Sequence, residues 1–272
     1  MRGRLGNMAG RPVLWHIAVS HYNEKARWAL DYKGVEHGRR APPPGMHMGI
    51  ALWLTRGRSK TFPVLELDGD AYGDSTEIIE VLERRYPEPP LYPEDPEERN
   101  RALELEDFFD EEVAPHVRLL AWHEVIKDPE PFGRFAAEVL PPAMRGPGRL
   151  IAGRYGTWVL KARYGVANAD SAELARSKVH AGFDRLETEL GSGEYLVGDS
   201  FTVADLTAAS ILYPIVRPPE GPRVALDYPE PLERFRLSFS DRPGYKWIQE
   251  MFRRHRKRSP ASARADVAAA RS

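Results

Sequence analysis

Two different patterns of hydrophobic and polar positions divide this chain of 272 residues. Before residue 87, short apolar runs alternate with turn residues and with two stretches of helical spacing. Strands are predicted at residues 13–19, 35–40, 62–67 and 71–73, and helices at 22–33, around 49–54 and from 75 onward. The "DGD" between the last two strands predicts a tight hairpin turn. This order predicts a small mixed-sheet domain with a β-α-β-(irregular)-β-β-α succession.

Beyond residue 98 the apolar positions repeat at helical spacing, and strand signals are scarce. Leu105, Phe109, Val113 and Val117 step by four and predict one face of a long helix. Residues 172–190 predict a second long helix, and the apolar run at 206–216 predicts a helix that is buried on every side.

The start of that buried helix carries a signal of its own in "FTVADL". Thr202 and Asp205, three residues apart, fit a capping box, and Phe201 and Leu206 fit a hydrophobic staple around it. We expect these residues to serve folding and stability. The capping-box pattern also occurs at Asp74 and Glu77, where the helix from residue 75 begins.

A proline-rich stretch, "RRYPEPPLYPEDPEERN", separates the two patterns. Its five prolines predict an extended linker, because proline disfavours helix and restricts the residue before it. The predicted organisation is a mixed-sheet domain at 12–87, a linker at 88–98 and an all-helical domain at 99–252, with disordered tails at 1–11 and 253–272. Residues 127–169 are interrupted by proline and glycine and are expected to form an insertion with two shorter helices.

Composition and charge narrow the function. The net charge of −1 gives no field that favours nucleic acid, and the basic "RRHRKR" at 253–258 is typical of a solvated tail. The absence of cysteine excludes disulfides, thiolate metal sites and cysteine nucleophiles, and we expect no metal. No apolar run reaches the roughly 20 residues that span a bilayer, and "MRGRLGNMAG" lacks the apolar stretch of a secretory signal. A cytoplasmic protein without membrane or nucleic-acid partners is expected.

Four motifs, "SHYNEKARWAL", "TFPVLELDG", "GDSTEI" and "FTVADL", occur in an order that resembles the soluble glutathione S-transferase family. The resemblance implies a thioredoxin-like α+β domain followed by an all-helical domain, glutathione as co-substrate, a homodimer and a role in detoxification. It also places Ser20 at the family's catalytic Ser/Cys position. Two residues depart from related patterns: His21 stands where such members often have proline, and Asn23 stands where related redox proteins have a second sulfur.

The role that the resemblance gives Ser20 is to donate a hydrogen bond to the glutathione sulfur. A free thiol has a pKa near 8.5, and lowering it by about 2 units requires about 2.7 kcal/mol of preferential stabilisation of the thiolate. A hydroxyl donor and a helix N-terminus both stabilise an anion. The alternative is that Ser20 only caps the helix. If Ser20 is not the donor, His21, Tyr22 and Asn23 are substitute thiol donors on the same turn.

The resemblance also implies a binding site for the glutathione backbone. Pro63, in cis, would let Val64 pair through its N–H and C=O with the peptide-like ligand. Asp74 suits the ammonium and Ser75 the carboxylate of the γ-glutamyl end, at the start of a helix. Lys60, or less favourably Arg58, would pair with the glycine carboxylate. Each residue also has a plain structural interpretation: a proline at a strand start, a capping box or a solvated basic side chain.

The leading hypothesis is therefore a glutathione transferase that conjugates the thiolate to an apolar electrophile. The alternative is a non-catalytic binding or interaction module with the same fold. Thiol-disulfide exchange is disfavoured because the chain has no cysteine sulfur to form the mixed disulfide.

Overall fold

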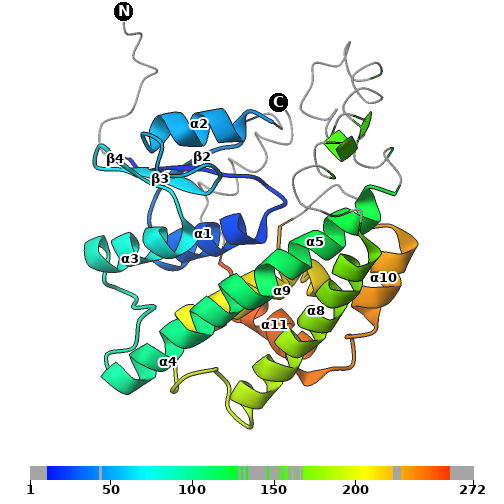
Figure 1. Ribbon diagram of the computed structural model, residues 1–272. Coiled ribbons are helices and arrows are strands. Elements are labelled where there is room, and N and C mark those ends of the chain that lie inside the picture. Colours follow the sequence, from blue (N-terminus) through cyan, green and yellow to red (C-terminus); the bar gives the residue numbers. More distant parts are fainter. Residues whose placement is uncertain are drawn as a thin grey trace, which may run out of the picture. The chain divides into compact units, whose positions relative to one another are not determined.

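The computed structural model describes residues 11–42, 45–127, 130, 133, 146, 153–154, 156–158, 161, 166, 168–222 and 228–257. The chain divides into two compact units, one of Met1–Leu91 with His255–Ser272 and one of Tyr92–Arg254. Figure 1 shows a sheet with flanking helices in the first unit and a helical second unit. The predicted fold class, a thioredoxin-like domain followed by an all-helical domain, is confirmed.

The sheet of the first unit has the strand order β2-β1-β3-β4. The strands are β1 (Val13–Trp15), β2 (Gly38–Arg40), β3 (Val64–Leu67) and β4 (Asp70–Tyr72). β1 is parallel to β2 and antiparallel to β3, so that Trp15 lies opposite Val64. All are shorter than, or shifted from, the predicted runs. β1 ends at Trp15, and the chain turns at Ala18 and Val19 before the helix that follows.

The predicted hairpin joins β3 to β4 through a two-residue turn. Leu67 pairs with Asp70, which leaves only Asp68 and Gly69 in the loop. Their φ angles are 53° and 92°, and a type I′ turn requires positive φ at both positions. Aspartate tolerates this conformation and glycine adopts it without a steric penalty, so the "DG" pair sets the strand register.

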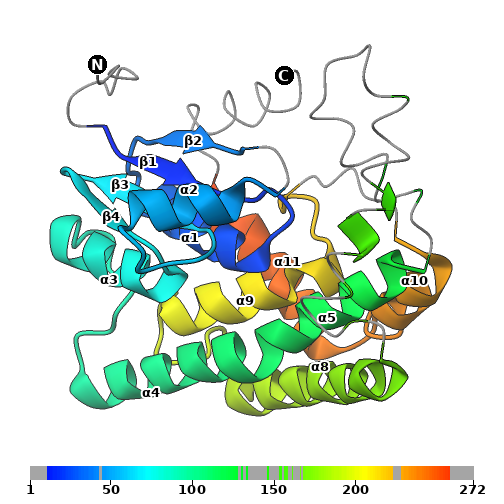
Figure 2. The ribbon, with the colours of Figure 1, turned by 45° about the horizontal axis from the view of Figure 1, so that its top comes forward.

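The helices of the first unit are α1 (His21–Tyr32), α2 (His47–Leu54) and α3 (Ser75–Arg85). In Figures 1 and 2, α1 and α3 cover one face of the sheet and α2 covers the other. Asp74 caps α3 by accepting the Thr76 N–H at 2.8 Å. Glu77 accepts the N–H of Gly73 at 2.9 Å, whereas the predicted capping box would have used the N–H of Asp74 itself.

The second unit begins earlier than predicted. Helix α4 (Pro96–Asp107) starts inside the proposed linker at 88–98, with Pro96 in its first turn. Proline fits there because the first N–H groups of a helix have no intrahelical acceptor. Asp95 caps the helix by accepting the N–H groups of Glu97 and Glu98. The extended, proline-rich segment therefore ends at Asp95, and the last proline of the predicted linker belongs to α4.

The predicted long helix is confirmed, with a π-helical segment in its middle. α4 continues into η1 (Phe108–Val113) and α5 (Ala114–Val125). The four residues that step by four are all buried. In an α-helix of 3.6 residues per turn, a step of four drifts around the axis. The wider π turn accommodates an extra residue and keeps this face directed inward.

The remaining described helices are α8 (Ala169–Leu190), α9 (Val203–Val216), α10 (Glu230–Leu237) and α11 (Pro243–His255). α9 is buried along all 14 residues, as its apolar run predicts. Its capping box is confirmed: Thr202 Oγ1 accepts the Ala204 N–H and Asp205 Oδ2 accepts the Thr202 N–H. Most of the expected insertion at 127–169 and its two helices lie outside the described residues.

The prediction of a disordered tail from residue 253 is wrong for its first residues. α11 continues to His255, and Arg256 is buried with 6% of its surface exposed. The remaining residues, 258–272, and those of the N-terminal tail at 1–10 lie outside the described part of the chain. Arg256 is buried because two carboxylates of the first unit receive it, as described below.

Candidate functional site

Ser20 lies at the N-cap position of α1, but its side chain does not cap the helix. The residue is half-buried and extended, with φ −84° and ψ 129°, and the hydroxyl makes no capping hydrogen bond. The backbone carbonyl instead accepts the Glu24 N–H at 3.0 Å. The helix therefore begins without a hydrogen bond to the Ser20 hydroxyl, and the structure does not support Ser20 as a simple side-chain cap.

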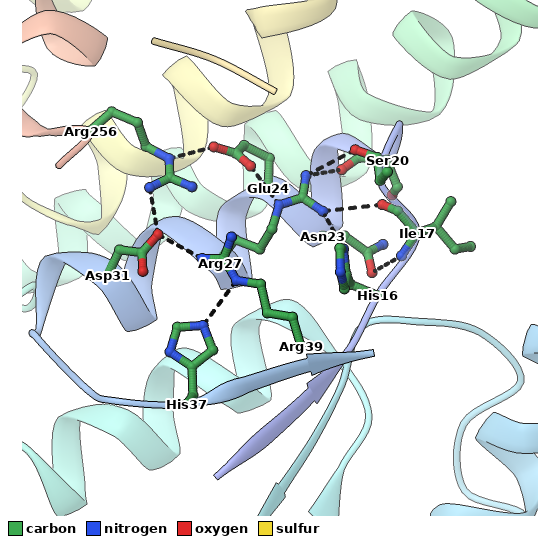
Figure 3. Close-up of polar contacts among 11 residues, drawn as sticks. His16, Ile17, Ser20, Asn23, Glu24, Arg27, Asp31, His37, Arg39 and Arg256 are labelled. Atoms are coloured by element: carbon green, nitrogen blue, oxygen red, sulfur yellow. Dashed lines mark hydrogen bonds and ion pairs between the residues drawn. The ribbon is translucent and has the colours of Figure 1, made fainter. Parts of the chain in front are cut away.

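Arg27 holds the loop that carries Ser20. Its Nη1 donates to the carbonyl of Ile17 at 3.2 Å, and its Nη2 donates to the carbonyls of Ala18 at 3.1 Å and Ser20 at 3.5 Å (Figure 3). The side chain is buried. A planar guanidinium with fixed donors is suited to gathering several carbonyls in one geometry. Arg27 thus donates to three backbone carbonyls of the segment from Ile17 to Ser20.

Asn23 connects this loop to the peptide that precedes Pro63. Its Oδ1 accepts the Ile17 N–H at 3.0 Å, and its Nδ2 donates to the Phe62 carbonyl at 3.2 Å. The Phe62–Pro63 peptide bond is cis, as the resemblance implied. Asn23 is fully buried, so its amide serves the backbone. The role of Asn23 as a substitute thiol donor stays a prediction, and the structure adds that its amide joins these two backbone segments.

Lys25 fixes the start of α3 in the same way. This buried lysine donates from Nζ to Thr76 Oγ1 at 3.0 Å. Thr76 directly follows Asp74 and Ser75, of which Asp74 is exposed and Ser75 is buried. α1 therefore holds three segments, at 17–20, 62–64 and 74–76, which we call the three-segment cradle. It contains every residue proposed to contact glutathione except Lys60 and the substitute donors.

His21 and Tyr22 stay predictions as substitute donors. Their rings lie 4.6 Å apart between centroids, and His21 is buried whereas Tyr22 is half-buried. Tyr22 is thus the more accessible of the two.

The segment that carries Lys60 packs closely against the turn between β4 and α3. A Cβ on Gly73 would lie 2.5 Å from Ser59 Cβ, so only glycine fits there. Arg58 donates from Nη2 to the Ala71 carbonyl at 2.7 Å, so this guanidinium already has a backbone partner. Lys60 is exposed, and its role toward a carboxylate stays a prediction.

A buried cluster of charges is joined to the Ser20 loop through Arg27 (Figure 3). Glu24 accepts from Arg27 Nε at 2.7 Å through one oxygen and from Arg256 Nε at 2.5 Å through the other. Asp31 accepts from Arg256 Nη1 and from Arg39 Nη2, each at 2.7 Å. Burial alone would raise the pKa of Glu24, but the charges and hydrogen bonds of Arg256 and Arg27 outweigh it and lower the pKa to about 2.

His16 completes this cluster as a neutral group. Its Nδ1 lies 2.9 Å from Arg27 Nη1. Because a guanidinium only donates hydrogen bonds, Nδ1 must be the acceptor and the ring proton is assigned to Nε2. Burial lowers the pKa of His16 well below its usual value, and the charges of Arg27 and Arg39 lower it further. Arg27 therefore has a hydrogen-bond acceptor for each of its five donor hydrogens.

Reasoning from the sequence identified the cradle but missed the side chains that hold it, namely Asn23, Glu24, Lys25, Arg27 and Arg256. One signal was available. α1 has so few large apolar residues that it can bury ten of its twelve positions only by burying polar ones. A polar helix predicted next to a reactive position therefore indicates buried hydrogen bonds.

Comparison with known families agrees with this architecture. The model of the glutathione S-transferase N-terminal domain matches residues 14–90, and the model of the C-terminal domain matches residues 169–248. The chain belongs to the glutathione S-transferase family. In the described part of the chain, no helix is both long enough and apolar enough to cross a membrane.

Among curated relatives, the chain is 29% identical over 208 residues to maleylacetoacetate isomerase of Dictyostelium discoideum, covering 75% of this chain and 78% of that protein. The Rattus norvegicus protein of the same name is 26% identical over 207 residues, with 74% and 76% covered.

Two solved structures show the shared fold. A glutathione S-transferase of Methylobacterium radiotolerans in complex with glutathione sulfonate is 24% identical, covers 87% of this chain and 93% of its own, and has a TM-score of 0.54. The β-etherase LigF of Sphingobium sp. strain SYK-6 is 23% identical, covers 88% and 98%, and has a TM-score of 0.58.

Proposed function

We propose that this chain is a glutathione-dependent transferase in which Ser20 donates a hydrogen bond to the sulfur of bound glutathione. Membership of the family supports a glutathione-dependent enzyme in general. The observation that carries the finer proposal is the Ser20 hydroxyl, which lies at the N-terminus of α1 without a capping bond while its backbone is fixed by Arg27.

The Ser20 hydroxyl and the N-terminus of α1 can together stabilise the thiolate by the amount that the proposal requires. Lowering the thiol pKa from about 8.5 to about 6.5 needs about 2.7 kcal/mol. A hydrogen bond to a charged acceptor contributes about 1.5–3 kcal/mol, and a helix N-terminus contributes about 0.3–1 kcal/mol or more when partly buried. Ser20 and the first turn of α1 together supply this amount.

The same cradle is proposed to hold the rest of the tripeptide. Asp74 uses Oδ1 to cap α3 and would offer its carboxylate to the ammonium of the γ-glutamyl group. The buried Ser75, at the first position of α3, suits the neighbouring carboxylate through its backbone N–H and hydroxyl. Val64 would pair with the peptide as an added strand does, and the exposed Lys60 would reach the glycine carboxylate.

In the proposed reaction, the thiolate sulfur forms a bond to an electrophilic carbon and the leaving group departs with its electron pair. A second candidate is favoured by the curated relatives named maleylacetoacetate isomerase. There the thiolate would add to a conjugated double bond, allow rotation about the resulting single bond and then leave, so that glutathione is regenerated. Homodimer formation and a cytoplasmic location belong to the same proposal.

The test compares Ser20→Ala with Ser192→Ala, which removes an exposed hydroxyl from the second unit. We expect Ser20→Ala to return the pKa of bound glutathione, followed by thiolate absorbance, toward about 8.5. Turnover of chlorodinitrobenzene or maleylacetoacetate at pH 6.5 should fall about 50-fold, because the thiolate fraction falls from about one half to about one hundredth when the pKa rises from about 6.5 to about 8.5. Ser192→Ala should match the wild type.

Three outcomes separate the readings. An unshifted thiol in the wild-type complex would refute activation by this protein. Unchanged turnover in Ser20→Ala would transfer the donor role to a neighbour such as Tyr22. Binding of glutathione without any turnover would support the non-catalytic module.

A further inference from the structure

We propose that Arg256 is a positioning residue for the Ser20 loop: it orients Glu24, which orients Arg27, which fixes the loop backbone. This inference rests on the proposed role of Ser20, and it assigns a function to a segment that the sequence pattern places in a solvated tail.

Arg256 is seated on α1 by several independent contacts. Its Nε donates to Glu24 and its Nη1 to Asp31, residues that precede it in the chain by 232 and 225 positions. Trp28 donates from Nε1 to the His255 carbonyl at 3.1 Å, and the Arg256 guanidinium lies 5.9 Å from the centre of the Trp28 ring. A buried side chain with this many partners has one defined position.

Arg256 is not required to neutralise the cluster. Arg27 already pairs with Glu24, and Arg39 already pairs with Asp31, each at 2.7 Å. The two pairs balance in charge, and Arg256 adds a positive charge between them. Its contribution is therefore orientation: it occupies the second oxygen of Glu24 and leaves the first oxygen for Arg27. The first unit can be expected to fold without it.

The orientation of Glu24 matters because Arg27 is a rigid fork. The Arg27 Nε points at Glu24 Oε2, which sets the plane of the guanidinium. The two terminal nitrogens then meet the carbonyls of Ile17, Ala18 and Ser20. If Glu24 rotates, the plane rotates with it and these carbonyls lose their donors. The Ser20 hydroxyl then samples more positions, and fewer of them meet the sulfur.

The experiment compares Arg256→Met, Arg256→Lys and the control Lys257→Met, which removes an exposed charge one residue further on. Amide hydrogen exchange of the peptide covering residues 17–20 is measured without glutathione. The pKa of bound glutathione and the kcat and KM of conjugation are measured separately. A merely structural role for Arg256 would lower thermal stability without moving the pKa.

For Arg256→Met we expect faster exchange at 17–20, a thiol pKa about one unit higher and kcat/KM about fivefold lower at pH 6.5, with KM little changed. Arg256→Lys, which keeps the charge but not the fork, should fall in between, and Lys257→Met should match the wild type. Wild-type exchange and wild-type thiol pKa in a folded Arg256→Met protein would overturn the proposal. If that variant does not fold, Arg256→Lys decides by the same two readouts. An ordinary thiol pKa in the wild type would refute the proposed function, while the exchange data would still test Arg256.

Discussion

Replacement of Asn23 by alanine tests whether α1 organises the three-segment cradle. The substitution removes two hydrogen bonds, one to the Ile17 N–H and one to the Phe62 carbonyl. The Phe62 carbonyl is buried with its residue, and a buried group left without a partner costs about 1–3 kcal/mol. Ile17 is half-buried, so water can replace its lost partner at a cost of about 1 kcal/mol. We expect a loss of about 2–4 kcal/mol of unfolding free energy.

Asn168→Ala is the matched control. Asn168 is an exposed N-cap that accepts one hydrogen bond, from the Asp170 N–H at 2.9 Å in α8. Losing such a cap costs about 1 kcal/mol. Both variants are unfolded in urea, and glutathione binding is measured by calorimetry. Asn23→Ala should also weaken binding about tenfold, corresponding to 1.4 kcal/mol, because the loop and the Val64 peptide are no longer tied together. The reasoning fails if the two variants lose the same stability and bind glutathione equally well.

Three further predictions concern stability. Gly182→Ala should lower the free energy of unfolding by about 1 kcal/mol, because the new Cβ would lie 2.9 Å from Val113 Cγ1 and overpacking outweighs the gain in helix propensity. In a Val113→Ala background the same substitution should be stabilising, and a persisting loss would contradict a steric cause. Asp205→Ala should lower the free energy of unfolding in urea by about 3 kcal/mol, because the buried N–H groups of Leu196 and Thr202 lose their acceptor. A loss below 1 kcal/mol would disprove this. Because the pKa of His16 is lowered in the folded state, the unfolded chain binds the extra proton, so stability should fall as pH drops below about 6.5; His16→Gln should reduce that slope by about 1 kcal/mol per pH unit, and an unchanged slope would exclude His16 as its source.

Local patterns were sufficient for most of the fold. The "DG" turn and the capping box at Thr202 act between neighbouring residues, so the sequence shows both partners at once. The start of α4 was misplaced because proline density was weighed without the rule that Pro96 can begin a helix after the cap Asp95. The π-helical segment has no local signal except the step of four, which an α-helix also tolerates.

The support of the candidate site could not be predicted for a different reason. Glu24 and Arg27 are one turn apart and look like an exposed helical ion pair, whereas both are buried. Glu24 also accepts a hydrogen bond from Arg256, which lies 232 positions further along the chain in a basic run that looks like a solvated tail. Asn23 likewise joins two segments that no local pattern connects. Pairings over such separations are decided by tertiary packing alone.

The complete burial of α9 has a consequence for biosynthesis. After Asp205 the helix contains no charged residue, so the segment is prone to aggregate whenever it is exposed. Helices α4 and α5, which pack against it, precede it in the chain and are therefore made first during translation. Pro214, inside the helix, is a poor component of intermolecular β-structure. The order of the helices along the chain thus provides a surface that can cover this segment as it is synthesised. Pro214 disfavours intermolecular β-structure until α9 has packed against α4 and α5.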